Sequence, residues 1–313
     1  MQAVIITLKL NKILIIFLCS STAILFFTNA KNTSAFVFEA IEFCIKNIIP
    51  TLMPFMIITS TFLYSKVFSR INPKKLYNLG VCKKYFSTSL IASLCGFVVG
   101  PKTICEDASS SQMKSKDFSS AITMSSNAGI GFVIGCVGAR LWGSVLFGAL
   151  LFVFQILSSI CINKVIFNIK SDENSNNSYS TENASFLSAF SKGISSSISS
   201  LMLICTYTIF FSVFLNSVFS FFNIDSNSIL YKIAFVVFEF CQGSFTAMQF
   251  DNVPLRALLS GFCVGFGGIC VHLQTFAICE GFNLNKKKFF LFKLLQGILC
   301  GIFSFIIISL MKI

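Results

Sequence analysis

Several polar side chains stand inside long apolar stretches of this sequence, where such groups are costly and usually serve a function. Asn127 offers both a donor and an acceptor, which suits a nucleobase or a ribose, but it could equally cap a broken helix. Glu239 closes a short apolar run, where it could bind a cation, a proton or a ligand amine, or instead reach water at the interface. His272 could titrate and gate a site, although a lone histidine on an apolar face is more often a packing residue.

Three glutamines and a lysine extend this set. Gln155, Gln242 and Gln274 fit either contacts to a ligand or hydrogen bonds between helices. Lys102 follows a Gly-Pro pair, where it could hold an anionic group, although a lysine that stretches to the membrane surface is the commoner case. The sequence has one histidine, no C-x-x-C pair among its 13 cysteines, and no hydrolase, metalloprotease or nucleotide-binding motif. We therefore predict a binding site with no enzymatic activity, metal or cofactor.

The elements that must position these groups follow from composition. Of 313 residues, 55% are hydrophobic and 12% are charged, whereas soluble domains carry about 25% charged residues. The apolar residues suffice for roughly eight spanning or half-spanning helices of about 20 residues each. This composition excludes a soluble enzyme, a disordered chain and a secreted disulfide scaffold. It predicts an all-α, polytopic helical membrane protein.

The net charge of +12 indicates topology rather than nucleic-acid binding. Basic residues gather in short segments between apolar runs, at 66–86 and 286–293, as the positive-inside rule expects of cytoplasmic loops. We predict a first helix over 13–27 that is retained rather than cleaved as a signal peptide, with its N-terminus in the cytoplasm. A helix over 33–47 at the membrane surface or lining a polar interior follows, and then a spanning helix over 48–65.

Several apolar runs are interrupted in a way typical of broken or re-entrant helices. Ser87–Gly100 has only 14 residues, too few to cross about 30 Å at about 1.5 Å per residue, and it stops before Pro101. Phe118–Val137 is interrupted by an Asn-x-Gly sequence, and Ala257–Cys279 is broken at Gly265–Gly268. A break inside the membrane leaves N–H groups and carbonyls free to bind a ligand, and glycine lets a ligand approach the backbone.

The two halves of the chain can be aligned across an Asn/Ser-rich linker at 171–185. Three pairs match with similar spacing: Gly96–Gly100 with Glu239–Gly243, Asn127–Gly129 with Phe266–Gly268, and Gln155 with Gln296. Paired broken segments in corresponding halves are the best sequence indication of a transporter-like site near the membrane midplane. The alternative is that the glycines only allow close helix packing. The predicted units are a first transmembrane helix, a first repeat, a linker and a second repeat, at 1–34, 35–165, 166–190 and 191–313.

Taken in order, these motifs resemble the YlbJ family of sporulation integral membrane proteins, over roughly residues 40–311. The resemblance rests on Gly96–Lys102, Ser126–Gly129, Glu239 with Gly243, and Phe266–Gly268 followed by His272-x-Gln274. The family pattern has a proline where this chain has Val98 and an asparagine where it has Ser126. The family belongs to the nucleoside-recognition, or Gate, domain proteins, which share a domain with nucleoside transporters and with the membrane part of the ferrous-iron transporter. The resemblance implies a role in spore formation, and the domain implies transport of a small, nucleoside-like solute.

These arguments together define the expected site and its surroundings. The candidate substrate-binding residues are Gly100, Lys102, Asn127, Gly129, Glu239, Gln242, Gly243, Gly267, Gly268, His272 and Gln274. The expected partners are the lipid bilayer of the plasma or forespore membrane, a small solute and other spore-envelope membrane proteins, with no nucleic acid. The alternative function is that of a non-transporting structural or assembly protein of the developing spore envelope.

Overall fold

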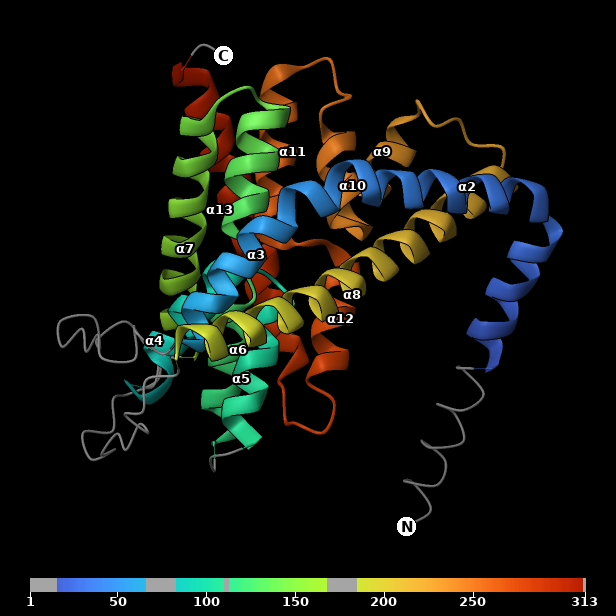
Figure 1. The fold of residues 1–313 in the computed structure, drawn as a ribbon. Coiled ribbons are helices and arrows are strands. Elements are labelled where there is room, and N and C mark those ends of the chain that lie inside the picture. Colours follow the sequence, from blue (N-terminus) through green and yellow to red (C-terminus); the bar gives the residue numbers. More distant parts are fainter. Residues whose placement is uncertain (1–15, 66–82, 110–112, 168–184, 312–313) are drawn as a thin grey trace.

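The regular structure of the described part of the chain is entirely helical. The computed structural model describes residues 16–65, 83–109, 113–167 and 185–311, and within these ranges it contains helices and no strand (Figure 1). The prediction of an all-α fold is confirmed. The predicted basic loop at 66–86 and the predicted linker at 171–185 lie almost wholly outside the described residues.

Five helices in the described ranges are long and apolar enough to cross a membrane, by length and composition. Three shorter apolar helices accompany them, in agreement with the expected eight or so apolar elements. The long helices are Ala30–Tyr64, α7 (Val145–Phe167), α8 (Phe186–Phe221), the α11–α12 pair (Val253–Ile278) and α13 (Lys286–Met311). The shorter ones are Ile16–Thr28, η4 (Gly131–Leu141) and α9 (Ile229–Phe238). The chain is thus a polytopic helical membrane protein.

The first long helix corrects the sequence prediction of two separate helices over 33–47 and 48–65. In the structure, α2 (Ala30–Phe43) passes through a π-helical turn, η1 (Cys44–Ile48), directly into α3 (Ile49–Tyr64). Pro50 follows this turn at the start of α3. A π-helical turn inserts an extra residue into the helix. A proline in the first turn of a helix costs little, because the N–H that it lacks would have no partner within that helix. The proline therefore does not end the helix.

Four further helices are interrupted, as the sequence predicts. In the first half, break 1 (96–98) separates α4 (Lys83–Cys95) from α5 (Val99–Ser109), and break 2 (126–129) separates α6 (Ser115–Ser125) from η4. In the second half, break 3 (Glu239) separates α9 from α10 (Phe240–Ala247), and break 4 (Gly267) separates α11 (Val253–Phe266) from α12 (Gly268–Ile278). The short helices on either side of each break are the half-helices that the short apolar runs predict.

Break 1 begins a few residues earlier than the predicted Gly100-Pro101 pair. Gly96 has a φ of +108°, a conformation that glycine adopts at little cost. Pro101 instead sits in the first turn of α5, where the helix has no N–H bond for it to remove. The polar stretch after Lys102 continues α5 to Ser109.

The order of elements is the same in the two halves: a long helix, two interrupted helices and a second long helix. Matching elements pack against each other and run in opposite directions, α3 along α8 and α7 along α13 (Figure 1). Residues aligned in the sequence also meet. The rings of Phe97 and Phe240 have centroids 5.0 Å apart, and Gln296 Nε2 donates to the Gln155 carbonyl at 2.9 Å. A repeat of inverted topology produces such contacts near its axis; the repeat itself stays a prediction.

Apolar side chains cover the outside of the molecule, and polar side chains lie inside it. Phe210 and Met202 are exposed on α8, and Leu291 and Ile306 are exposed on α13, whereas Thr208 and Gln296 on the same helices are buried. This is the reverse of a soluble protein, in which polar groups face water. Lipid tails suit such an exterior, so the described helices belong in a lipid bilayer.

Candidate functional site

Break 1 and break 2 touch each other through their backbones. A Cβ added at Gly129 would lie 3.3 Å from the Gly96 Cα and 3.3 Å from the Cys95 carbonyl oxygen. A side chain at Gly129 would force the two breaks apart, so glycine is what permits this approach. The first half of the chain therefore brings its two interruptions into direct contact.

Break 3 and break 4 touch in the same way. Gly267 and Gly268 have φ values of +81° and +74°, and a Cβ added at Gly268 would lie 3.0 Å from the Phe240 nitrogen. Glu239 forms break 3 with an extended backbone, and its side chain caps the N-terminus of α10. The predicted site residues Gly129, Gly267 and Gly268 thus act as the contact points between breaks.

Phe97 of break 1 joins the two halves. Its ring meets Phe240 edge to face and lies over Gly267, where an added Cβ would come within 2.8 Å of the ring. Phe240 also contacts Phe132 of η4, with ring centroids 4.4 Å apart. All four breaks therefore converge on one group of aromatic side chains.

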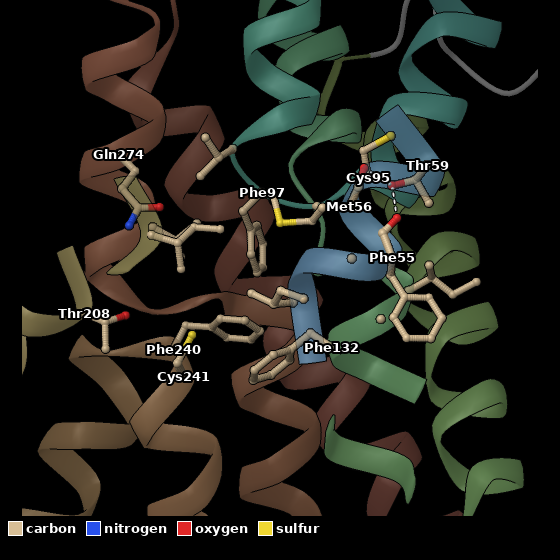
Figure 2. Close-up of a pocket in the computed structure, with 18 of the residues that line it drawn as sticks. Phe55, Met56, Thr59, Cys95, Phe97, Phe132, Thr208, Phe240, Cys241 and Gln274 are labelled. Atoms are coloured by element: carbon tan, nitrogen blue, oxygen red, sulfur yellow. Dashed lines mark hydrogen bonds between the residues drawn. The ribbon is translucent and has the colours of Figure 1, made fainter. Parts of the chain in front are cut away.

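A small, largely apolar pocket lies at this convergence (Figure 2). Its volume is about 40 Å³, which at about 10–15 Å³ for each water is room for about three water molecules. The wall is formed by breaks 1, 2 and 3, by the helix ends beside them in α4, η4 and α10, and by α3, α8 and α12. It includes Phe55, Met56, Thr59, Cys95, Gly96, Phe97, Gly129, Phe132, Thr208, Glu239, Phe240, Cys241, Cys270 and Gln274.

Glu239 is completely buried in this wall. Its carboxylate accepts hydrogen bonds from the Thr208 hydroxyl at 2.9 Å, from the Cys241 N–H at 3.2 Å and from the Gln242 N–H. Negative charge is favourable at a helix N-terminus, so α10 itself stabilises this group. The structure therefore does not place Glu239 at an interface with water, which was one of the two alternatives that the sequence left open.

Gln274 presents the unused hydrogen-bonding capacity of the pocket. The side chain lies on α12, is 2% exposed and lines the pocket. Its Oε1 atom has no hydrogen-bond partner within the described residues, and Figure 2 shows the amide on the opposite side of the pocket from Cys95 and Thr59. A buried acceptor without a donor is costly, so this oxygen is the strongest single indication of a bound polar group.

Asn127 lies outside the pocket wall, at the centre of a second polar cluster that also contains Gln155, Lys293 and Gln296. Its Oδ1 accepts from Gln296 Nε2 at 2.8 Å, from Lys293 Nζ at 3.4 Å and from Gln155 Nε2 at 3.5 Å. Its Nδ2 donates to the Met124 carbonyl at 2.9 Å and so caps the end of α6. The capping alternative for Asn127 is therefore visible, whereas its predicted contact to a solute stays a prediction, and Asn127 is not among the residues that line the pocket.

Lys293 is the principal residue that the sequence analysis missed. It was grouped with the basic segment 286–293, yet it is completely buried, while Lys286 and Lys287 are exposed at the start of the same helix. The spacing that could have found it is Lys293-x-x-Gln296 within an apolar run, because residues three apart share a helix face. Thr208 on α8 was missed as well, since one threonine among many hydroxyl residues gives no signal.

Two predicted glycines have a packing role instead. A Cβ added at Gly100 would lie 2.4 Å from the Ser125 carbonyl oxygen, and one at Gly243 would lie 2.6 Å from the Phe235 carbonyl oxygen. Both residues lie inside helices, one in α5 and one in α10, and neither lines the pocket. At these two positions the alternative of close helix packing accounts for the glycine.

Three other predicted residues also lie away from the pocket. Lys102 donates to the Ser199 hydroxyl at 3.2 Å and lines a separate, open surface hollow with Glu106. The side chain of Gln242 is half-buried on α10 and is not part of the wall. His272 bonds through Nε2 to the Phe266 carbonyl at 2.9 Å, and its ring packs edge-on against phenylalanines, which favours the packing alternative.

Comparisons with protein-family models, with curated proteins and with solved structures find no match to this chain.

Proposed function

We propose that this chain binds a small solute where its four helix breaks meet, and moves that solute across the membrane by shifting the breaks relative to one another. The observation that carries the proposal is that breaks 1, 2 and 3 line one pocket and that break 4 packs against the Phe97 ring in its wall. Secondary transporters characteristically bind their substrates at paired broken helices in matching halves. The sequence has no nucleotide-binding motif, so we expect an ion gradient to supply the energy.

The chemistry of the wall supports a small, flat, polar solute of nucleoside type. Phe97, Phe132 and Phe240 offer aromatic surfaces of the kind on which bases stack. Gln274 Oε1 offers a free acceptor for an amino or ring N–H group. The present volume of about 40 Å³ is far below the several hundred Å³ typical of ligand pockets, so we expect the pocket to widen before a solute enters.

The setting of this activity rests on the sequence. The motif order supports a role in spore formation, and the placement of lysine and arginine residues supports an N-terminus on the cytoplasmic side. We propose accordingly that the protein lies in the plasma or forespore membrane of an endospore-forming cell.

Uptake and binding in liposomes test this function. Purified protein would be reconstituted and assayed with radiolabelled uridine, adenosine and hypoxanthine. We expect binding of at least one of these, and a weakening of about tenfold in Gln274→Leu, because about 1.4 kcal/mol corresponds to the loss of one such hydrogen bond. The matched control is Gln249→Leu, which changes an exposed glutamine outside the wall and should bind normally.

Three outcomes would count against the proposal. Absence of binding for all three compounds would contradict the proposal of a nucleoside-like solute. Equal binding by Gln274→Leu and Gln249→Leu would contradict the assignment of the pocket as the binding site. Normal spore formation by a strain carrying both Asn127→Ala and Glu239→Ala would favour the alternative, a structural or assembly protein.

A further inference from the structure

A buried positive charge lies directly behind the pocket wall. Lys293 is 0% exposed, and its Nζ donates to Gln296 Oε1 at 2.8 Å and to Asn127 Oδ1 at 3.4 Å. Neither partner is charged, and no carboxylate of the described residues forms an ion pair with it. An ammonium ion surrounded only by neutral oxygens is costly in a membrane interior, where an apolar side chain of similar volume would be cheaper.

We propose that Lys293 is the proton-binding site of this protein, and that loss of its proton opens the solute pocket. The inference rests on the proposed function, because it names the ion whose movement is coupled to that of the solute. The position matched to Lys293 in the first half is Phe152, three residues before Gln155. In the predicted alignment of the two halves an apolar residue therefore occupies this position, and the charge is particular to the second half.

The contacts of Lys293 connect its charge to the breaks. Its Nζ lies 5.3 Å from the centre of the Phe97 ring, a distance at which an ammonium attracts an aromatic face. Phe97 is part of the pocket wall, covers Gly267 of break 4 and meets Phe240 beside break 3. Asn127, which receives the hydrogen bond, belongs to break 2. The charge is therefore in contact with breaks 1 and 2 and reaches breaks 3 and 4 through one ring.

The proton step is simple. The Lys293 ammonium gives one proton to water that enters from one side of the membrane and becomes a neutral amine. The neutral amine no longer attracts the Phe97 ring, and its hydrogen bonds to Asn127 and Gln296 lose the strengthening that a charged donor provides. Phe97 can then turn away from Gly267 and widen the pocket. A proton taken from the other side restores the ammonium and the closed arrangement.

The effect of Lys293 on the pH dependence must be distinguished from the effects of other titratable groups near it. Cys300 on the same helix and His272 on α12 are the buried titratable groups that lie within electrostatic range of it. The helices α6, α7 and α11 also pack against α13. They carry Lys116, Asp117, Cys161, Lys164, Arg256 and Cys263, and Lys293 makes no ion pair with any of these.

Hydrogen–deuterium exchange measured by mass spectrometry tests the proposal without any solute. The protein would be labelled in lipid nanodiscs from about pH 5 to about pH 10, which spans the range over which a buried lysine can titrate. Labelling times would be scaled for the intrinsic exchange rate at each pH. We expect exchange at residues 95–99 and 126–130 to rise about tenfold with pH in the native protein.

Variants at position 293 decide the outcome. Lys293→Arg keeps its charge and should remain slow at every pH, and Lys293→Met should be fast at every pH. Lys287→Met, His272→Gln and Cys300→Ser should keep the native rise. The proposal is overturned if Lys293→Arg keeps the rise, or if His272→Gln or Cys300→Ser abolishes it. Lys293→Arg tests the proposal even if Lys293→Met does not fold. The exchange experiment contains no solute, so failed nucleoside binding would not affect its outcome.

Discussion

The two buried charges near the breaks are held in opposite ways. Glu239 receives two of its hydrogen bonds from backbone N–H groups two and three residues further along the chain, at the start of the helix that it caps. Lys293 has one partner on its own helix, Gln296 at 2.8 Å, and a second on break 2, Asn127, which lies 166 residues away in sequence. The acid is therefore stabilised mainly by its own helix, whereas the base also depends on break 2 lying against α13.

This difference separates a structural charge from a movable one. A carboxylate held mainly by its own helix keeps most of its donors if the breaks move, because the Cys241 and Gln242 N–H groups move with it. An ammonium that shares an acceptor on another element loses that partner as soon as the two elements separate. We infer that the Glu239 side of the site acts as a fixed wall and that the Lys293 side moves.

The largest effect is expected from removal of Asn127. Asn127→Leu takes away the acceptor shared by Lys293, Gln155 and Gln296 and leaves a buried ammonium with one partner fewer. We expect a loss of about 3 kcal/mol of unfolding free energy, measured by titrating purified protein in micelles with a denaturing detergent. Adding Lys293→Met to Asn127→Leu should recover part of the loss. An additive double variant would contradict the assembly of this cluster.

An intermediate effect is expected from the two packing glycines. Gly100→Ala and Gly243→Ala place a Cβ against backbone carbonyls, in one half each. Each should lower the unfolding free energy by about 2 kcal/mol, since overpacking against rigid backbone costs about 1–3 kcal/mol. Gly135→Ala is the matched control, because its nearest neighbour would be a ring atom of Phe55 at 3.9 Å. Equal melting of all three variants would show that these helices do not pack this closely.

A smaller effect is expected at Glu239. Glu239→Ala removes the cap of α10 and should cost about 1 kcal/mol, while Glu239→Gln keeps an acceptor and should cost less. Because the cap is local, neither change should alter the exchange of residues 126–130. Faster exchange in that segment would contradict the separation between a fixed and a moving side.

The smallest effect is expected at Thr208. Thr208→Val keeps the shape of the side chain and removes one donor to Glu239. Hydrogen bonds between membrane helices contribute about 0.6 kcal/mol on average, so a loss of that order in unfolding free energy should follow. Thr206→Val is the control, because its hydroxyl bonds only to its own helix and is exposed. If Thr208→Val lowered the unfolding free energy by more than about 2 kcal/mol, Glu239 would depend on a distant partner as strongly as Lys293 does, and the contrast between the two residues would be wrong.

The sequence predicted the breaks because their signals are local. Glycine, proline and polar residues interrupt short apolar runs, and three of the four interruptions lie where this pattern placed them. The fourth shifted by a few residues, from Gly100 to Gly96, because a glycine can serve either a positive φ or a close helix contact and the sequence does not distinguish these uses. The merged helix over Ala30–Tyr64 was missed because a π-helical turn leaves no clear trace in composition.

The site itself was less predictable. Glu239 and Gln274 stood out as polar residues in apolar runs, and both line the pocket. The aromatic wall could not be recognised, since Phe97, Phe132 and Phe240 are three of 39 phenylalanines. Lys293 was hidden by three neighbouring lysines that do reach the surface. Its role depends on contacts with residues more than a hundred positions away, which no local pattern reveals.

The central claim is that the breaks enclose a pocket that opens to water, and the native cysteines test it directly. Cys95, Cys241 and Cys270 line the pocket, whereas Cys136, Cys263 and Cys300 are equally buried elsewhere. The measurement is the alkylation rate of each thiol by N-ethylmaleimide in liposomes, read by mass spectrometry and normalised to the denatured protein. The account predicts that the three pocket cysteines react at least about tenfold faster than the other three. Equal protection of all six would contradict it.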